Sequence, residues 1–146
     1  MPSRRRRSTR VLLVEAGDAY ARTLECVFLA THTVEVVGRA RDGAEGVGLA
    51  FALEPDCVLM DLSMPIIDGL EATRVIRSRL PHVRVVILTS SDDQSDRACA
   101  QAAGAHGYLT KGCSLRELES AVTRGHALSP VLPRSEVVRT AELAAS

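Results

Sequence analysis

Short runs of aliphatic residues alternate with longer amphipathic stretches along most of the chain. The aliphatic runs predict strands at Arg10–Val14, Val34–Gly38, Cys57–Met60, Arg84–Leu88 and Gly107–Leu109. Continuously apolar runs among them are typical of strands buried on both faces of a sheet. The stretches in between are long enough for helices at Ala19–Ala30, Ala44–Leu53, Leu70–Arg79, Gln94–Ala103 and Leu115–His126.

Strands that alternate with helices predict an α/β fold with an open parallel sheet and helices on both of its faces. In such sheets, ligands bind outside the carboxyl ends of the strands. The residues that directly follow each strand are therefore the candidates for a functional site.

Several residues at the predicted helix starts are typical of caps and turns. Ser114 and Glu117 have the spacing of a capping box. Asp68 is interpreted as a turn or cap residue, and Gly69 is expected to supply a left-handed turn before the helix. Asp18 directly precedes a predicted helix, so a helix-cap role is favoured for it.

Four side chains, with three kinds of functional group, lie at the ends of four different strands. Glu15 and Asp61 bring carboxylates, Thr89 a hydroxyl and Lys111 an ammonium. Together they suit a phosphorylated aspartate, because a carboxylate attacks phosphorus, an oxygen-bound divalent cation offsets charge and a lysine adds a point charge. Taken singly, each residue has an ordinary structural role in a turn or at the surface. Their joint arrival at one edge of the sheet favours the site.

Composition strengthens the case for Lys111. Of the 18 basic residues, 17 are arginine and Lys111 is the one lysine. An ammonium is a compact, strongly hydrated charge, unlike the planar guanidinium group. A single lysine in such a chain indicates a position that requires an ammonium.

The remaining composition bounds the class of protein. Five arginines lie in the first ten residues, which leaves 13 basic against 18 acidic residues beyond them. Two interpretations of this basic arm stay open: contact with nucleic acid or an anionic surface, and the commoner solvated terminus. No apolar run approaches the roughly 20 residues of a membrane span, and no secretory signal is present, so we expect a cytoplasmic protein. The four cysteines form no CxxC pair, and Cys57 is expected to be a core residue.

Three motifs, in this order, resemble the receiver domain of bacterial two-component response regulators. They are VLMDLSMPIIDG at 58–69, VVILTS at 85–90 and GYLTK at 107–111. The resemblance covers about residues 9–127 and implies a flavodoxin-like, doubly wound five-stranded sheet of order 2-1-3-4-5. It also implies a phosphoprotein, not an enzyme, that takes its phosphoryl group from a histidine kinase or phosphotransfer protein.

The resemblance also assigns roles to single residues. Asp61 is the implied phosphoacceptor, Thr89 the switch hydroxyl, Lys111 the phosphoryl-contacting lysine and Tyr108 the aromatic residue that turns inward on activation. Mg²⁺ is implied as the cofactor, with Glu15, Asp61 and the backbone carbonyl of Ser63 as ligands. The side chains of Ser63 and Ser91 occupy positions similar to those that tune phosphate lifetime.

The sequence departs from the family at two places. Receivers usually have two adjacent acidic residues after the first strand, and here Glu15 is followed by Ala16, so one metal ligand is missing. Water can fill the gap, and Asp18 is a second candidate to contribute through water, so we expect weaker Mg²⁺ binding, with complete loss as the alternative. Gly112 stands where the family commonly has a proline. Many regulators with a helix-turn-helix output also lack this proline.

The sequence predicts a basic arm at 1–9, a receiver domain at 10–127 and a linker-like tail at 128–146 that includes some helix. The leading hypothesis is a stand-alone receiver that signals through phosphorylation-dependent binding of an effector protein. The alternative is a phosphorylation-independent interaction module, disabled at Ala16, with a homodimer as one arrangement. A flavin enzyme and direct DNA binding rank lower, and a truncated regulator stays open.

Overall fold

The computed structural model describes residues 7–62, 64, 68–90 and 93–123. The tail predicted at 128–146 and most of the basic arm lie outside these ranges, so their predicted boundaries stay predictions. Within the described ranges, none of the helices combines the length and the apolar character needed to cross a bilayer.

Five strands and five helices alternate along the described chain. The strands are β1 (Thr9–Val14), β2 (Val34–Ala40), β3 (Cys57–Met60), β4 (Arg84–Thr89) and β5 (Gly107–Thr110). The helices are α1 (Asp18–Thr31), α2 (Gly43–Leu53), α3 (Gly69–Arg79), α4 (Gln94–Ala102) and α5 (Leu115–Thr123). All neighbouring strands pair in parallel, in the order β2-β1-β3-β4-β5. The predicted fold class and strand order are confirmed.

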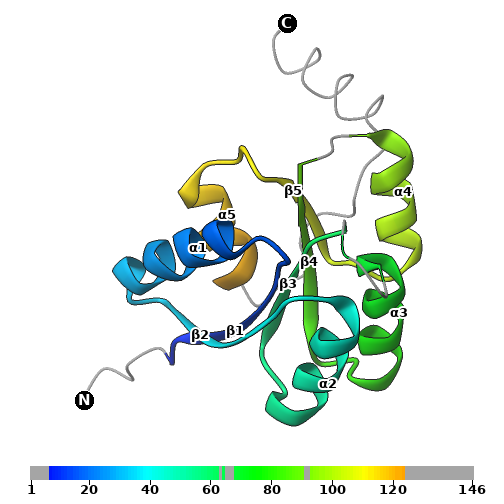
Figure 1. Cartoon of the computed structure of the whole chain (residues 1–146), viewed down its shortest axis with the longest axis horizontal. Helices are drawn as coiled ribbons and strands as arrows, with labels where there is room; N and C mark the ends of the chain where they lie inside the picture. Colours follow the sequence, from blue (N-terminus) through cyan, green and yellow to red (C-terminus); the bar gives the residue numbers. More distant parts are fainter. Residues whose placement is uncertain (1–6, 63, 65–67, 91–92, 124–146) are drawn as a thin grey trace, which may run out of the picture.

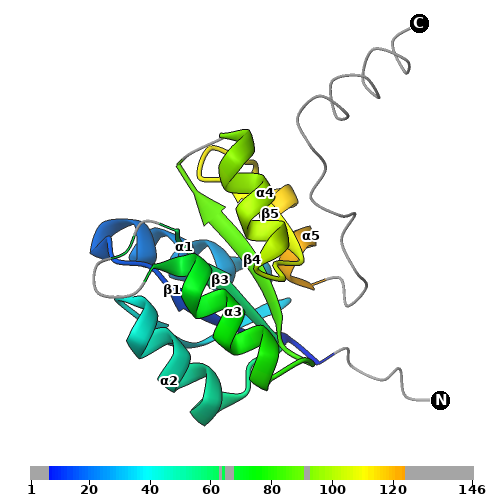
Figure 2. The same cartoon turned by 90° about the vertical axis from the view of Figure 1, so that its right-hand side faces the viewer.

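Two helical layers cover the sheet (Figures 1 and 2). Helices α1 and α5 lie on one face, where Leu24, Phe28 and Val122 pack with alternate strand residues. Helices α2, α3 and α4 cover the other face, where Ala50, Ile76 and Ala100 form a second apolar cluster. Because the central strands are buried on both sides, their sequences read as continuous apolar runs. Cys57 is fully buried, as expected for a core residue.

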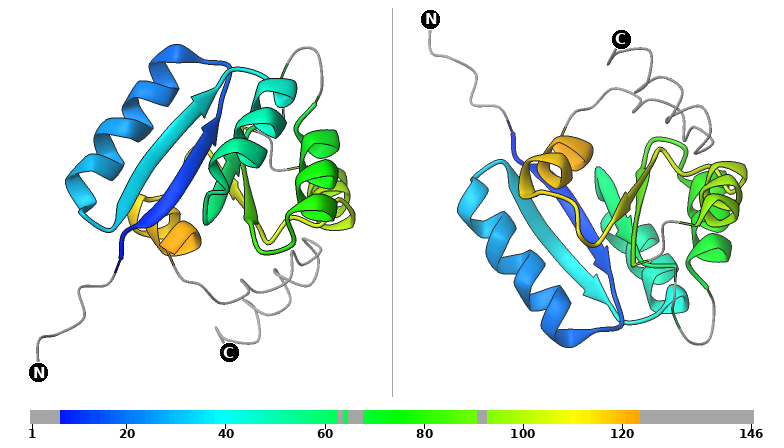
Figure 3. Two further views of the ribbon diagram at one scale, coloured as in Figure 1. Left: turned by 90° about the horizontal axis from the view of Figure 1, so that it is seen from below. Right: turned by 90° about the horizontal axis from the view of Figure 1, so that it is seen from above.

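Strand β2 carries one extra residue opposite β1, and Figure 3 shows the two strands side by side. Val11 pairs with Val36, whereas Leu12 pairs with Gly38, so Val37 is the additional residue. Because side chains alternate between the faces of a strand, this bulge moves every later residue of β2 to the opposite face. Arg39 therefore lies opposite Leu13, on the side of the sheet that α1 covers.

Two predicted caps are confirmed. The Asp68 side chain accepts a hydrogen bond from the Glu71 backbone N–H at 2.8 Å and begins α3. The Ser114 hydroxyl accepts from the Glu117 N–H at 3.1 Å, which is one half of the predicted capping box. These bonds satisfy backbone donors that the first turn of each helix leaves without an intrahelical partner.

The predictions for Asp18 and Gly69 are wrong. Gly17 is the N-cap of α1 and makes no side-chain cap bond, while Asp18 is the first helical residue and forms an ion pair with Arg39. Gly69 is the first residue of α3, and among the described residues Gly104 is the glycine with a positive φ. What position 69 requires is space, because a Cβ there would overlap the carbonyl oxygen of Asp61.

Candidate functional site

The backbone of the sheet brings three of the predicted site residues to one edge. The ladder continues one residue past the strands, with backbone hydrogen bonds donated by the N–H groups of Glu15, Asp61 and Lys111 at 2.9, 3.0 and 2.7 Å. Glu15 follows β1, Asp61 follows β3 and Lys111 follows β5. Parallel strands in register thus fix the starting point of each side chain, as expected for the carboxyl edge of such a sheet.

The ammonium of Lys111 joins the two carboxylates. Its Nζ donates to Glu15 Oε1 at 3.1 Å and lies 3.0 Å from Oε2, and it is 3.4 Å from Asp61 Oδ2. Glu15 and Asp61 are only 6% and 5% exposed. The Lys111 ammonium therefore holds two buried carboxylates close together, and its positive charge stabilises their negative charge.

The surroundings of Lys111 act on its pKa in opposite directions. Burial by itself lowers the pKa of an ammonium, because it disfavours the charged form. The hydrogen bond to Glu15 and the charge of Asp61 outweigh burial, so the pKa of Lys111 lies above its ordinary value. The lysine is therefore a permanent cation at neutral pH.

Thr89 and Tyr108 lie next to this trio on neighbouring strands. Thr89 ends β4, which pairs with both β3 and β5, and it is 1% exposed. Ile87 pairs with Tyr108, and Thr89, two residues beyond Ile87, shares its face of the sheet. The Tyr108 ring is buried, and the Arg97 guanidinium lies 4.7 Å from its centroid. The predicted switch pair thus shares one face of β4 and β5, under α4.

Gly69 provides the space behind the candidate acceptor. A Cβ at this position would overlap the Asp61 carbonyl oxygen and lie 2.9 Å from Leu62 Cα. The start of α3 therefore packs directly against the backbone that carries Asp61. Sequence reasoning assigned Gly69 to a left-handed turn and missed this contact, although its place in the motif after Asp61 pointed to a local role.

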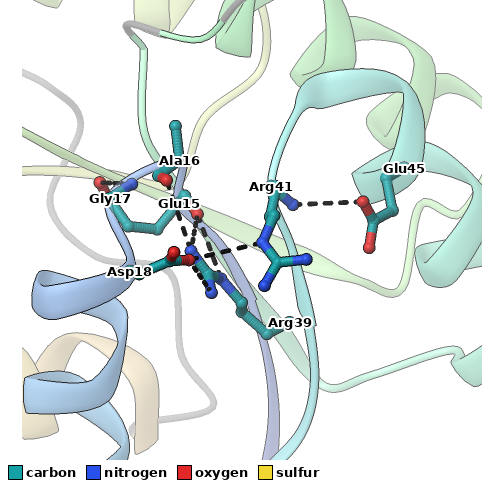
Figure 4. A network of polar contacts seen from close by, with 7 residues as sticks. All are labelled: Glu15, Ala16, Gly17, Asp18, Arg39, Arg41 and Glu45. Carbon is teal, nitrogen blue, oxygen red and sulfur yellow. Dashed lines mark hydrogen bonds and ion pairs between the residues drawn. The ribbon is translucent and has the colours of Figure 1, made fainter.

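The loop after β1 is tied to β2 by Arg39 (Figure 4). The guanidinium donates to the Glu15 carbonyl oxygen at 2.9 and 3.3 Å, and it forms a 2.7 Å ion pair with Asp18. Arg41 also contacts Asp18, at 3.4 Å. The hydrogen bond from Arg39 is the largest cause that holds the pKa of Asp18 below its ordinary value. Asp18 is thus an anion engaged by two arginines.

At the acidic corner of the site, Glu15 is followed by Ala16. Ala16 is exposed, and its side chain ends at a methyl group. Among the described residues, no three His, Cys, Asp or Glu side chains are grouped so that they could hold a metal ion. Glu15 and Asp61 are nevertheless oxygen donors of the kind that Mg²⁺ prefers, and Mg²⁺ retains several waters readily. The residues present therefore fit this metal in kind, with one protein ligand fewer.

Two predicted positions are not part of this geometry. Ser63 and Ser91 lie outside the described residues. Ser63 was predicted as a backbone metal ligand, and both residues were predicted as positions that tune phosphate lifetime. Two other residues escaped the sequence analysis. Arg39 reaches the site only because of the bulge in β2, which no pattern in the sequence announces. Tyr20, whose ring lies 4.7 Å from the Lys111 Nζ, reads in sequence as an ordinary helix residue.

Comparisons with known proteins agree with this geometry. The family model of the response regulator receiver domain matches residues 11–123. The chain is 36% identical over 124 residues to the transcriptional regulatory protein LnrK of Bacillus subtilis, covering 85% of this chain and 56% of LnrK. It is 39% identical over 113 residues to LiaR of the same species, covering 77% of this chain and 54% of LiaR. The chain thus spans about half the length of these curated relatives.

A solved structure shows the same architecture. The signal receiver domain of the putative response regulator NarL from Mycobacterium tuberculosis superposes with a TM-score of 0.76 at 30% identity, covering 79% of this chain and 93% of that domain. The family model begins in β1 and ends in α5, so its match to this chain includes all ten elements described above. This chain therefore belongs to the family of response regulator receiver domains.

Proposed function

We propose that this chain is a cytoplasmic signalling receiver that accepts a phosphoryl group on Asp61 and transmits its state by binding another protein. The observation that carries the proposal is the ammonium of the single lysine, 3.4 Å from the Asp61 carboxylate and in contact with Glu15. This is the charge arrangement that a carboxylate needs when it receives a phosphoryl group.

Each residue has a definite part in the proposed reaction. One carboxylate oxygen of Asp61 forms the bond to phosphorus while the bond from phosphorus to the donor breaks. Lys111 offsets the charge that the phosphoryl oxygens bring, and the Thr89 hydroxyl donates to one of them. The donor is a histidine kinase or a phosphotransfer protein, by membership of the family.

Receiver domains generally bind Mg²⁺ at their acidic pocket. In this chain Glu15, Asp61 and the backbone carbonyl of Ser63 would hold it, with water in place of the carboxylate that Ala16 lacks. The metal would supply positive charge next to the phosphoryl oxygens. Because one ligand is absent, we propose that Mg²⁺ binds more weakly here than at a complete acidic pair.

The proposed output is a change of the face formed by α4, β5 and α5. Thr89 and Tyr108 share one side of the sheet beneath α4, so a phosphoryl group that engages Thr89 acts close to the Tyr108 ring. Tyr108 in turn contacts Arg97 of α4. The effector is proposed to be a protein that binds this face, while direct binding of DNA is not part of the proposal.

A small phosphodonor tests the acceptor. The full chain is incubated with acetyl phosphate and Mg²⁺, and its intact mass is followed. We expect the addition of one phosphoryl group to the wild type and none to Asp61→Asn, which keeps the shape of the side chain but lacks the nucleophilic carboxylate. Equal incorporation in both proteins would place the modification elsewhere, and no incorporation in either would contradict the proposal.

A second candidate function is a receiver-like interaction module that works without phosphorylation. The observation in its favour is that both Glu15 oxygens contact Lys111 and that Oε1 also accepts from the Gly17 N–H at 3.1 Å. A carboxylate engaged in this way is a poorer metal ligand. A titration with Mg²⁺, followed by amide NMR shifts, separates the candidates: shifts around Glu15 and Asp61 at millimolar Mg²⁺ favour the phosphorylated receiver, and their absence favours the module.

A further inference from the structure

Tyr20 lies at the edge of the site and contacts the residue that carries its positive charge. It is in the first turn of α1, directly after the loop that holds Glu15 and Ala16. The Lys111 Nζ is 4.7 Å from the centroid of the Tyr20 ring. This is within the distance of roughly 6 Å over which the face of an aromatic ring attracts a cation.

We propose that Tyr20 is a positioning residue for Lys111. The Tyr20 ring holds the Lys111 ammonium beside Glu15, at the acidic corner that Ala16 has weakened. The proposal deepens the function proposed above and rests on it for its consequence, namely the rate at which Asp61 accepts a phosphoryl group. The contact itself is independent of that function, because it is present in the unphosphorylated chain.

The need for such a residue follows from the charges. A lysine has a long flexible side chain, and a fixed position for its ammonium requires partners on more than one side. Glu15 and Asp61, which directly follow β1 and β3, supply two of them. An acidic residue at position 16 would add a further negative charge close by, and Ala16 adds none. The electron-rich face of the Tyr20 ring offers attraction from α1 without a formal charge.

A ring that merely packs against the core is the simpler alternative. Tyr20 does adjoin the apolar cluster under α1, which contains Leu24 and Phe28. Packing alone would be satisfied by leucine, which fills similar space but has no ring face. Phenylalanine, in contrast, keeps the face and loses only the hydroxyl. The pair of substitutions therefore separates packing from a cation–ring contact.

The composition of the chain makes the contact directly observable. Lys111 is the one lysine, so lysine labelled with ¹³C gives a single set of side-chain signals. Protons above the face of an aromatic ring resonate upfield. We expect an upfield shift of the Lys111 Hε protons in the wild type, its retention in Tyr20→Phe and its loss in Tyr20→Leu.

The titration of Tyr20 gives a second readout. Burial raises the pKa of the Tyr20 phenol, and the Lys111 ammonium lowers it. Replacement of Lys111 by methionine removes the second effect and leaves the charges of Glu15 and Asp61, which raise the pKa of Tyr20, without this ammonium, so the pKa of Tyr20 should rise further. A Tyr108→Phe background leaves Tyr20 as the one tyrosine, and its absorbance then reports the titration alone.

The decisive comparison measures both the contact and its consequence in the full chain. With acetyl phosphate and Mg²⁺, Tyr20→Leu should accept the phosphoryl group roughly two- to five-fold more slowly than the wild type, and Tyr20→Phe at nearly the wild-type rate. Circular dichroism and urea unfolding check that each variant folds, and Tyr20→Met replaces Tyr20→Leu if the latter does not.

The outcomes distinguish the two proposals. An upfield Lys111 signal in a wild type that takes up no phosphoryl group would refute the proposed function and keep the contact. Normal uptake with the same Lys111 signal in all three proteins would refute the contact. Loss of the upfield shift in Tyr20→Leu without any change of rate would refute the positioning role.

Discussion

Glu15, Asp61 and Lys111 show how few residues define the chemistry of this site. The two carboxylates are buried and share one ammonium, and each comes from a different strand end. These three residues were predicted from the sequence. The two acidic residues and the one lysine each come after a predicted strand. Tyr20 contacts Lys111 across the fold, and no spacing in the sequence reveals this contact. Gly69 contacts the Asp61 backbone within one motif, where the sequence pointed to a local role but not to the contact itself.

At the residue scale, Gly69→Ala should destabilise the fold and displace Asp61, the proposed acceptor. The added methyl group overlaps the Asp61 carbonyl oxygen, which is backbone and has little freedom to move. We expect a loss of about 3 kcal/mol in the free energy of unfolding, measured with urea, and slower phosphorylation. Gly48→Ala is the matched control, since nothing lies within 4 Å of a Cβ there.

The control substitution should have the opposite sign. Gly48 is an exposed residue inside α2, where alanine is favoured over glycine by roughly 0.5 to 1 kcal/mol. If both alanine variants lost the same stability, overlap at Asp61 would not be the cause.

At the element scale, the bulge in β2 links the strand to the loop after β1. Most strand and helix ends lie within one or two residues of their predicted positions, because apolar runs and amphipathic periods fix where elements begin. The pairing register is not visible in that pattern. Val37 shifts the register by one residue and turns Arg39 toward Glu15 and Asp18. The contact between Asp18 and Arg39 was not predicted for this reason, whereas the cap role of Asp18 failed because α1 begins one residue earlier than predicted.

Arg39→Met should loosen this connection. The side chain is only 17% exposed, and its guanidinium donates to the Glu15 carbonyl oxygen. We expect a loss of about 1 kcal/mol in the free energy of unfolding, because a partly buried charge-assisted hydrogen bond is removed. Urea denaturation measures this change.

Arg41→Met is the matched control for the same measurement. Its side chain is 68% exposed and contacts Asp18 at 3.4 Å, so its loss should change the stability by less than about 0.5 kcal/mol. Equal losses in the two variants would show that the exposed ion pairs to Asp18, and not the bond to the loop carbonyl, account for the effect.

At the scale of the whole molecule, the edge of the sheet opposite the candidate site contains a titratable group that affects the stability of the fold. At the opposite edge, His106 precedes β5, and its Nδ1 accepts a hydrogen bond from the Val85 N–H at 3.1 Å. That bond requires a neutral imidazole ring whose Nδ1 carries no proton. Burial lowers the pKa of His106 below its ordinary value, and the charges of Arg77 and Arg84 lower it further.

This lowered pKa predicts a loss of stability in mild acid. Above pH 6.5, which is about the pKa of His106 in the unfolded chain, His106 is neutral in both the folded and the unfolded state. Its contribution to the free energy of unfolding is then complete. As the pH falls below that value, the unfolded chain binds the proton first, so the free energy of unfolding decreases until the folded pKa is passed. Urea unfolding at about pH 7.5 and about pH 5.5 should show this decrease.

His106→Asn isolates this contribution from the other titrating groups. Asparagine retains a side-chain acceptor near the position of Nδ1 and does not titrate. The variant should lose less stability than the wild type between the two pH values. An identical loss in both proteins would mean that other groups are responsible.

The Mg²⁺ dependence of phosphorylation is the sharpest test of the proposal that Asp61 is a phosphoryl acceptor beside a weakened metal corner. The initial rate with acetyl phosphate is measured over a series of Mg²⁺ concentrations for the wild type, Ala16→Asp and Asp61→Asn. The wild type should react. Ala16→Asp should reach its half-maximal rate at a Mg²⁺ concentration roughly tenfold lower than the wild type requires, because a missing ligand is restored. Asp61→Asn should not react. Failure of both the wild type and Ala16→Asp to take up a phosphoryl group at any Mg²⁺ concentration would refute the proposed role of Asp61.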